Sequence, residues 1–310
     1  MAKYVLVRVG QAVPTMIGVA IVGFFLVHLV PGDPGRIALG PRASEIAVRA
    51  FDDNLGVNGP IGQQFVRFLS GVTHLQFGQS FTQHESVSAA IASRIAPTAL
   101  LIGYGFLIAV AVTVPVSLFV AVRRDRAADH AVRAIGMVCY AMPVFWLGLL
   151  LSLVFGLQLG VLPTSGYASG LSGALKSLTL PAVTLALITA PLFIRTLRAS
   201  VIGALDAGYV EAARSRGLSE RRVLYRHALR NASIPFVTLV GLTVGALVSG
   251  AVVIENVFAL PGLGSLLVSA VTSRDFALVQ GLVVLLGLCV VVINLLADVL
   301  CAVLDPRIRP

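Results

Sequence analysis

Long apolar runs dominate the pattern of this chain, and the polar stretches between them are mostly short. A membrane-spanning helix needs about 20 predominantly apolar residues. Six runs meet that length, and they cover residues 9–30, 96–122, 132–159, 178–197, 234–257 and 276–303. The first run is longer than the apolar part of a signal peptide, so we expect it to be retained. The pattern predicts an all-α integral membrane protein with six spans and with both termini on one side.

The longest polar interval, residues 31–95, contains two helix-like stretches. The first, "ASEIAVRAFDDNLG", ends at Gly56, and the second, "PIGQQFVRFLSGV", has Pro60 at its predicted first helical position. In the second stretch the apolar residues fall on one helical face, namely Ile61, Phe65, Phe68 and Leu69. We expect an extracytoplasmic helical insertion here, with this helix on the membrane surface or capping the bundle.

Composition and charge agree with a membrane protein. The chain is 57% hydrophobic and only 12% charged, with a net charge of +9, whereas soluble domains are about 25% charged. Basic residues of polytopic membrane proteins gather in cytoplasmic loops, so the positive charge does not require nucleic acid. The side with both termini holds 16 Lys and Arg residues and the other side 7. Both termini are therefore predicted to be cytoplasmic.

A charged stretch, "YVEAARSRGLSERRVLYRHALRNASIP", interrupts this pattern at residues 209–235, between the fourth and fifth spans. Its first part predicts a short helix that Gly217 ends as a left-handed C-cap. Ser219 then caps a second helix, and Pro235 stands where the fifth span would begin.

Small residues lie at the centre of the first of these helices. Ala212 and Ala213 would let a partner surface approach the backbone closely, and Glu211 and Arg214 flank them with opposite charges. A solvated loop that obeys the positive-inside rule is the alternative. That alternative does not account for two helices with alanines at the centre of the first.

The chemistry of common enzymes is missing from the sequence. A phosphate-binding loop needs a Gly-Lys-Ser/Thr end, and neither lysine follows a glycine. The run "SGYASGLSG" lacks the Gly-x-Ser-x-Gly spacing of a hydrolase nucleophile. The five histidines form no His-x3-His pair. We therefore expect no catalytic residues, no metal site and no cofactor in this chain.

The family resemblance rests first on "EAARSRG" followed by "NASIP". The two segments resemble the EAA loop of binding-protein-dependent ABC importer permeases, and the matching residues are Glu211, Ala212, Ala213, Gly217, Ile234 and Pro235. The segments "GLSERRVLYRHALRNASIP", "VIENVFALPGLGSLLVSAVTSRDFALVQG" and "LLADVLCAVLDPRIR" resemble the dipeptide/oligopeptide/nickel branch. The front of the chain resembles the first-position permease of that branch, the DppB/OppB type. The resemblance covers essentially the whole chain.

This resemblance implies a type I ABC importer permease fold with a coupling helix at about 205–217. The implied ATPase-coupling residues are Tyr209, Glu211, Ala212, Ala213, Arg214, Arg216 and Gly217. ATP and Mg would be bound by one or two partner ABC ATPase subunits. The other implied partners are a second homologous permease (DppC/OppC type), an extracytoplasmic substrate-binding protein and the lipid bilayer.

Polar residues within the spans are candidates for a translocation pathway or gate. They are Glu255 and Asn256 on the fifth span and Gln280 and Asn294 on the sixth. Ionisable groups at membrane depth usually face protein or a water-filled cavity. Hydrogen bonding between helices is the alternative, and it is favoured for Asp298 near the cytoplasmic end.

Three glycines of the fifth span are candidates for close packing with the second permease, namely Gly241, Gly245 and Gly250.

The resulting organisation has four parts. They are a transmembrane helix at 1–30, the insertion at 31–95, a core permease domain at 96–304 and a cytoplasmic tail at 305–310. The expected cargo is a dipeptide or short oligopeptide, with nickel-chelate, haem or glutathione left open.

Two other classes of membrane protein would show different sequence features. A secondary transporter or channel predicts inverted repeats and no organised cytoplasmic helix. A membrane-embedded enzyme predicts paired catalytic groups in the spans. The sequence has neither the repeats nor such pairs.

Overall fold

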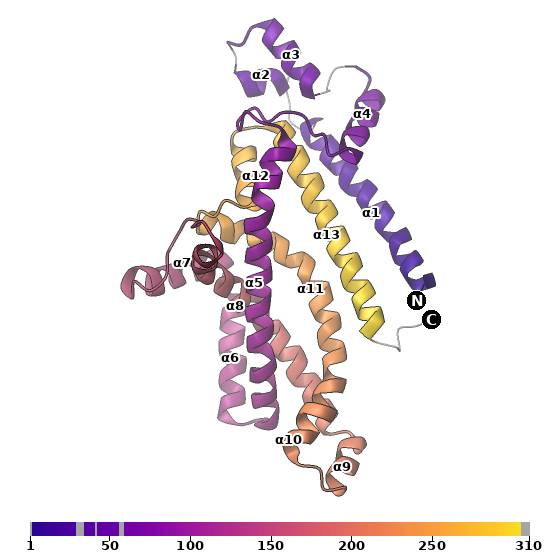
Figure 1. The fold of residues 1–310 in the computed structure, drawn as a ribbon, viewed down its shortest axis with the longest axis vertical. Helices are drawn as coiled ribbons and strands as arrows, with labels where there is room; N and C mark the ends of the chain where they lie inside the picture. Colours follow the sequence, from indigo (N-terminus) through magenta and orange to yellow (C-terminus); the bar gives the residue numbers. More distant parts are fainter. Residues whose placement is uncertain (1, 29–33, 41, 56–58, 305–310) are drawn as a thin grey trace. The chain divides into compact units, whose positions relative to one another are not determined.

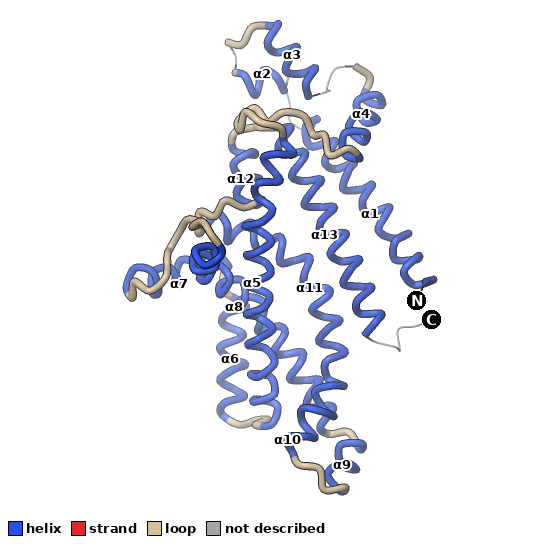
Figure 2. The backbone as a smooth tube through the Cα atoms, viewed as in Figure 1, coloured by secondary structure: helices blue, strands red, loops and turns tan. Residues whose placement is uncertain are grey.

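The computed structural model describes residues 2–28, 34–40, 42–55 and 59–304, and over these residues the chain is almost entirely helical (Figure 1). Helices and loops make up the described backbone, apart from one isolated bridge between Gln79 and Ser86 (Figure 2). The first elements are α1 (Ala2–His28), α2 (Pro34–Leu39), α3 (Glu45–Leu55), α4 (Ile61–Thr73), α5 (Val87–Val122), α6 (Ala127–Ala141) and α7 (Val144–Leu151). They are followed by η1 (Ser152–Gln158), α8 (Leu171–Leu205), α9 (Gly208–Ser215), α10 (Glu220–Arg222), η2 (Val223–Ala228), α11 (Leu229–Val257), α12 (Leu263–Thr272) and α13 (Phe276–Leu304). Here η denotes a π-helical segment.

Five of the described helices are long and apolar enough to cross a membrane, and a bent helix pair gives a sixth. The six predicted runs therefore correspond to five helices and one broken pair. Several helices extend beyond the apolar runs: α5 begins at Val87 rather than at 96, and α8 covers Leu171–Leu205. The predicted positions 29–33, 41, 56–58 and 305–310, which include the predicted helix end at Gly56, lie outside the described residues.

The prediction of one continuous third span over 132–159 is wrong. Its α6 ends at Ala141, α7 begins at Val144, and the two helix directions differ by 109°. Met142 between them is extended, with φ −74° and ψ 138°. Proline clashes with a helical backbone at the preceding residue, so Pro143 is the local cause of the break.

The charged stretch also differs from the prediction. The second cytoplasmic helix and the fifth span form one helical segment, Glu220–Val257, through α10, η2 and α11. Pro235 lies inside α11 rather than at the start of a span. Ser219 occupies the N-cap position of α10, but its side chain makes no capping hydrogen bond. The charged residues after Ser219 therefore extend a membrane helix directly.

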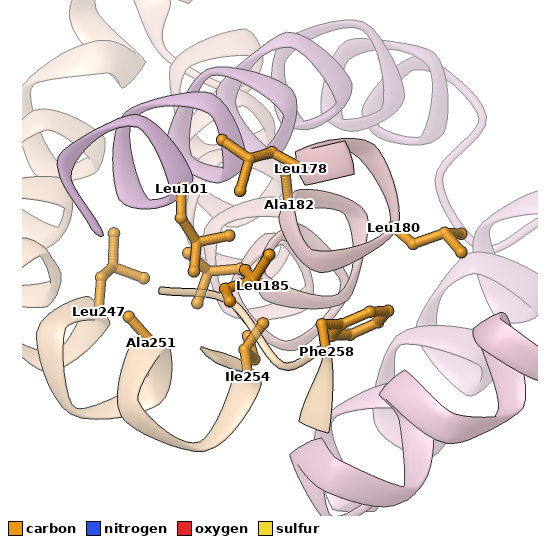
Figure 3. Packing of buried hydrophobic residues seen from close by; sticks show 10 residues of the cluster. Leu101, Leu178, Leu180, Ala182, Leu185, Leu247, Ala251, Ile254 and Phe258 are labelled. Carbon is orange, nitrogen blue, oxygen red and sulfur yellow. The ribbon is translucent and has the colours of Figure 1, made fainter. Parts of the chain in front are cut away.

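The chain divides into two compact units, of which unit 1 contains Ala99–Leu260 and the part of α13 from Leu296 onward. Within it α8 packs against α6, α7 and α11. A buried apolar cluster joins α5, α8 and α11 (Figure 3), and its members include Leu101, Leu178, Leu185, Leu247 and Ile254. Further along the same helices, Phe193 and Phe236 pack edge to face with ring centroids 5.6 Å apart. These contacts fix α8 and α11, the two helices that flank the charged stretch.

Unit 2 contains Val5–Thr98 and Pro261–Leu295. Here α4 packs on α1: the Phe24 ring lies 5.2 Å from Phe65 and 5.7 Å from Phe68. Beside these rings, the buried Gln64 side chain bonds to His28 Nε2 and donates to the Gly59 carbonyl, both at 2.8 Å.

The insertion follows the sequence prediction only in part. Ile61 and Leu69, predicted on the same apolar face as the two phenylalanines, are exposed. Pro60 is the N-cap of α4 rather than its first helical residue. The short helices α2 and α12 were not predicted.

Candidate functional site

The charged stretch is built around α9, a two-turn helix between the end of α8 and the start of α10. It covers Gly208–Ser215 and follows Ala207, whose extended backbone has φ −84° and ψ 142°. The predicted helix at 205–217 is therefore not continuous, because Leu205 is the last residue of α8 and α9 begins only at Gly208. The turn at Asp206 and Ala207 separates α9 from the membrane helix.

One face of α9 is buried against its own chain. Val210 and Ala213 form a small apolar cluster with Val223 of η2, and Leu205 and Leu218 pack around it. Ala213 therefore faces inward, and of the two predicted small residues only Ala212 is exposed. A partner surface that approaches this helix would lie over Ala212.

The helix ends as the sequence predicts, on a glycine in the left-handed region. Gly217 has φ +78°, and this confirms its predicted C-cap conformation. The Leu218 N–H donates to the Ala213 carbonyl at 3.3 Å, and the Gly217 N–H donates to the Arg214 carbonyl at 2.9 Å. These two bonds form a Schellman motif, with Leu218 packing back on the cluster.

An ion pair joins α9 to the next helix. The Arg214 guanidinium donates from Nε to Glu220 Oε1 at 2.8 Å and from Nη2 to Oε2 at 3.1 Å. The Glu220 carboxylate raises the pKa of Arg214 above its ordinary value. Arg214 is therefore engaged within the chain.

The outward surface of α9 and its C-terminal turn carries the remaining predicted coupling residues. These exposed residues are Tyr209, Glu211, Ala212 and Arg216. We call these four residues the outer face of α9. Two of the four, Tyr209 and Arg216, are of residue types that are enriched at protein interfaces.

The four pathway candidates differ in exposure. Glu255 near the end of α11 is 1% exposed, whereas its neighbour Asn256 is exposed and its side chain donates to the Val252 carbonyl at 2.7 Å. On the part of α13 that belongs to unit 2, Gln280 is half-buried and Asn294 is exposed. Glu255, the ionisable one of the four, has the burial expected of a functional group at membrane depth.

The three glycines of α11 serve packing within unit 1. A Cβ at Gly241 would lie 3.2 Å from both Ala297 Cβ and Cys301 Sγ of α13. A Cβ at Gly250 would lie 3.4 Å from Leu185 Cδ1 of α8. Gly245 is also buried. Helices of the same chain approach Gly241 and Gly250 closely, and packing of these glycines against a second permease stays a prediction.

Two carboxylates at most 1% exposed, Asp129 and Asp275, were not predicted as site residues from the sequence. In unit 1, the fully buried Asp129 of α6 accepts two hydrogen bonds from Arg198 of α8, one of them 2.6 Å from Nε to Oδ1. Its Oδ2 also accepts the Asp125 N–H at 3.1 Å. The only sequence signal was a carboxylate within the arginine-rich turn before the third span.

In unit 2, Asp275 is 1% exposed. Its Oδ2 accepts from Ser80 Oγ at 2.6 Å and from the Thr82 N–H at 2.9 Å and Oγ1 at 2.8 Å. Its Oδ1 accepts the Leu278 N–H at 3.1 Å. Asp275 therefore caps α13 and fastens the loop that contains Ser80 and Thr82.

Comparison with known proteins agrees with this architecture. Residues 113–310 match the family model of binding-protein-dependent transport system inner membrane components, and residues 1–102 match the model of its N-terminal region. A Brucella abortus (strain 2308) relative with the name "Putative peptide transport system permease protein" is 40% identical over 100% of this chain and 99% of its own length. The glutathione transport system permease protein of Salmonella paratyphi A is 38% identical over the same shares. The chain therefore belongs to the binding-protein-dependent transport system inner membrane component family, as an ABC importer permease of the peptide/oligopeptide branch.

Proposed function

We propose that this chain moves short peptides across the inner membrane. ATP-driven motion of a partner subunit is transmitted to it through the outer face of α9. The observation that carries the proposal is a helix locked to its own chain on one side and exposed on the other. Matches along the whole length to relatives named as peptide and glutathione permeases support the cargo class.

The mechanical part of the proposal follows from three connections of α9. The apolar cluster around Val210, the Schellman motif at Gly217 and the Arg214–Glu220 ion pair tie it to η2 and α10. Because α10, η2 and α11 form one helical segment up to Val257, a push on α9 acts through these three connections on a membrane helix. Rigid-body motion of packed helices is a common means of transmitting such a change.

The partners in this proposal are those that the family implies. One or two ATPase subunits bind ATP and Mg and contact Tyr209, Glu211, Ala212 and Arg216. A second, homologous permease completes the pathway, and an extracytoplasmic binding protein delivers the cargo. Both termini and α9 are cytoplasmic in this arrangement, in line with the basic residues on that side.

The coupling proposal is tested by reversing the charge of Glu211. We expect Glu211→Arg to lower peptide-stimulated ATP hydrolysis and uptake by the reconstituted importer at least about tenfold, because about 1.4 kcal/mol of lost contact corresponds to that factor. The control is Glu85→Arg, a reversal at another exposed carboxylate. Normal activity of an assembled Glu211→Arg importer would refute the coupling role.

The cargo is tested by competition. The purified importer with its binding protein should take up labelled dipeptides, and excess unlabelled dipeptide should block uptake. Glutathione is the second candidate, because several relatives are named as glutathione permeases. Uptake of glutathione that dipeptides do not inhibit would favour this second candidate.

We also propose that Glu255 contributes to the pathway or its gate, because it is an ionisable side chain buried in α11. Glu255→Gln keeps the size and removes the charge. We expect a slower transport rate in vesicles and altered peptide-stimulated ATP hydrolysis. If neither value changes, Glu255 has a structural role only.

A further inference from the structure

A cavity of about 590 Å³ lies between α6 and α8 in unit 1, and no residue of α9 lines it. Its lining comes from residues 130–140 of α6 and 191–198 of α8. This volume falls within the range of about 300–1,000 Å³ that is typical of small-molecule sites.

Three arginines and one histidine line this cavity. They are Arg133, Arg195, Arg198 and His130. Arg198 is held by the buried Asp129, and Arg133 Nη2 donates to His130 Nδ1 at 2.7 Å while its Nε lies 3.8 Å from Asp129. Three arginines against one carboxylate leave two positive charges in excess.

Arg195 is the most available of these cations. Its side chain is exposed, and in the described parts of the chain no carboxylate lies within ion-pair distance of it. Together with the outward part of Arg133, it can donate to an anion in the cavity.

The rest of the lining is apolar. Met137, Tyr140, Pro191 and Ile194 lie beside the arginines. Met137 is 76% exposed and Tyr140 is 64% exposed, although both belong to a helix of a membrane-spanning pair. A ligand with an anionic head and an apolar tail would satisfy both parts of this surface.

We propose that this cavity binds an anionic phospholipid, with the phosphate at Arg133 and Arg195 and the acyl chains along Met137 and Tyr140. Basic pockets between membrane helices are known to take anionic headgroups. A bound lipid would brace α6 against α8, the helix that leads into α9. The site does not depend on the cargo or on the coupling role of α9.

The test measures lipid binding to the delipidated, detergent-purified importer complex by native mass spectrometry. Phosphatidylglycerol is titrated against zwitterionic phosphatidylcholine, and inorganic phosphate serves as a second competitor. We expect retained phosphatidylglycerol adducts with the native chain. Arg195→Gln should weaken them about fivefold and Arg133→Gln/Arg195→Gln about 25-fold, since each arginine near an anionic surface contributes about 1 kcal/mol. Arg195→Lys should retain most of the binding.

The matched control is Arg126→Gln. Arg126 is the N-cap of the same helix and is exposed, but it does not line the cavity. Equal losses for Arg126→Gln and Arg195→Gln would overturn the proposal, because they indicate diffuse attraction to basic loops. Equal binding of phosphatidylcholine, or full displacement by inorganic phosphate or by an acidic peptide, would overturn it too. Met137→Glu, a change at an exposed position, should repel the lipid, and undiminished binding there would contradict the site.

Discussion

Replacing Gly217 with alanine tests how firmly α9 is held. Gly217 has φ +78°, and a Cβ added there would meet nothing within 4 Å. The cost is therefore conformational rather than steric, about 1–2 kcal/mol for an L-residue in the left-handed region. This cost destabilises the Schellman motif, which the Leu218 and Gly217 amides form by their hydrogen bonds.

Hydrogen exchange measures this cost locally. When amides exchange through local opening, a loss of about 1–2 kcal/mol raises the open population about 5–30-fold. We expect peptides that cover the 214–219 turn to exchange faster by that factor in Gly217→Ala. Exchange in the middle of α8 should not change. Peptide-stimulated ATP hydrolysis should fall in the same variant if α9 transmits motion.

Gly203→Ala is the matched control. Gly203 lies in α8, without a positive φ, and a Cβ there also meets nothing within 4 Å. Alanine at such a position should stabilise the helix by about 0.5–1 kcal/mol. Faster exchange of the 214–219 turn in Gly203→Ala, or unchanged exchange in Gly217→Ala, would refute the reasoning.

Three further predictions concern stability, measured by thermal unfolding of the purified complex. Asp275→Ala should lower the free energy of unfolding by about 3 kcal/mol, because it leaves buried donors without their acceptor. Thr82→Ala removes only the hydroxyl donor and should lower it by about 1 kcal/mol. Equal losses would contradict the cap role of Asp275. Asp129→Ala should lower the free energy of unfolding by about 3 kcal/mol, because Arg198 then lacks its buried partner. Adding Arg198→Met should recover part of this loss. Purely additive effects of the two substitutions would disprove the pairing. Arg274→Gly should stabilise by about 1 kcal/mol because Arg274 has φ +59°, and a lower unfolding temperature would contradict that sign.

Much of the fold could be predicted because membrane spans depend on local composition. The apolar runs locate α1, α5, α8, α11 and α13. Gly217 is likewise a local signal, since a left-handed residue after a short helix favours glycine. The relatives and the family model agree with the resemblance read from the EAA segment.

What the sequence could not give depends on contacts between distant residues. Asp129 and Arg198 are 69 residues apart, and Ser80 and Asp275 are 195 apart. The inward direction of Ala213 depends on Val223 across the turn. Pro143 itself is a local signal for the helix break, but the apolar residues on both sides of it predicted a single span. Pro235 was predicted to begin a span, but it lies inside a helix that continues on both sides of it.

The break at Pro143 also limits how far the third crossing can reach. With 15 residues, α6 is about 22 Å long, whereas the hydrocarbon core is about 30 Å thick. The turn of 109° directs α7 and η1 sideways, so they add no depth along the α6 direction. The helix α8, which packs against α6, has 35 residues and is long enough to cross the hydrocarbon core alone. Beside α6, local thinning of the bilayer or neighbouring protein is therefore expected to make up the missing length.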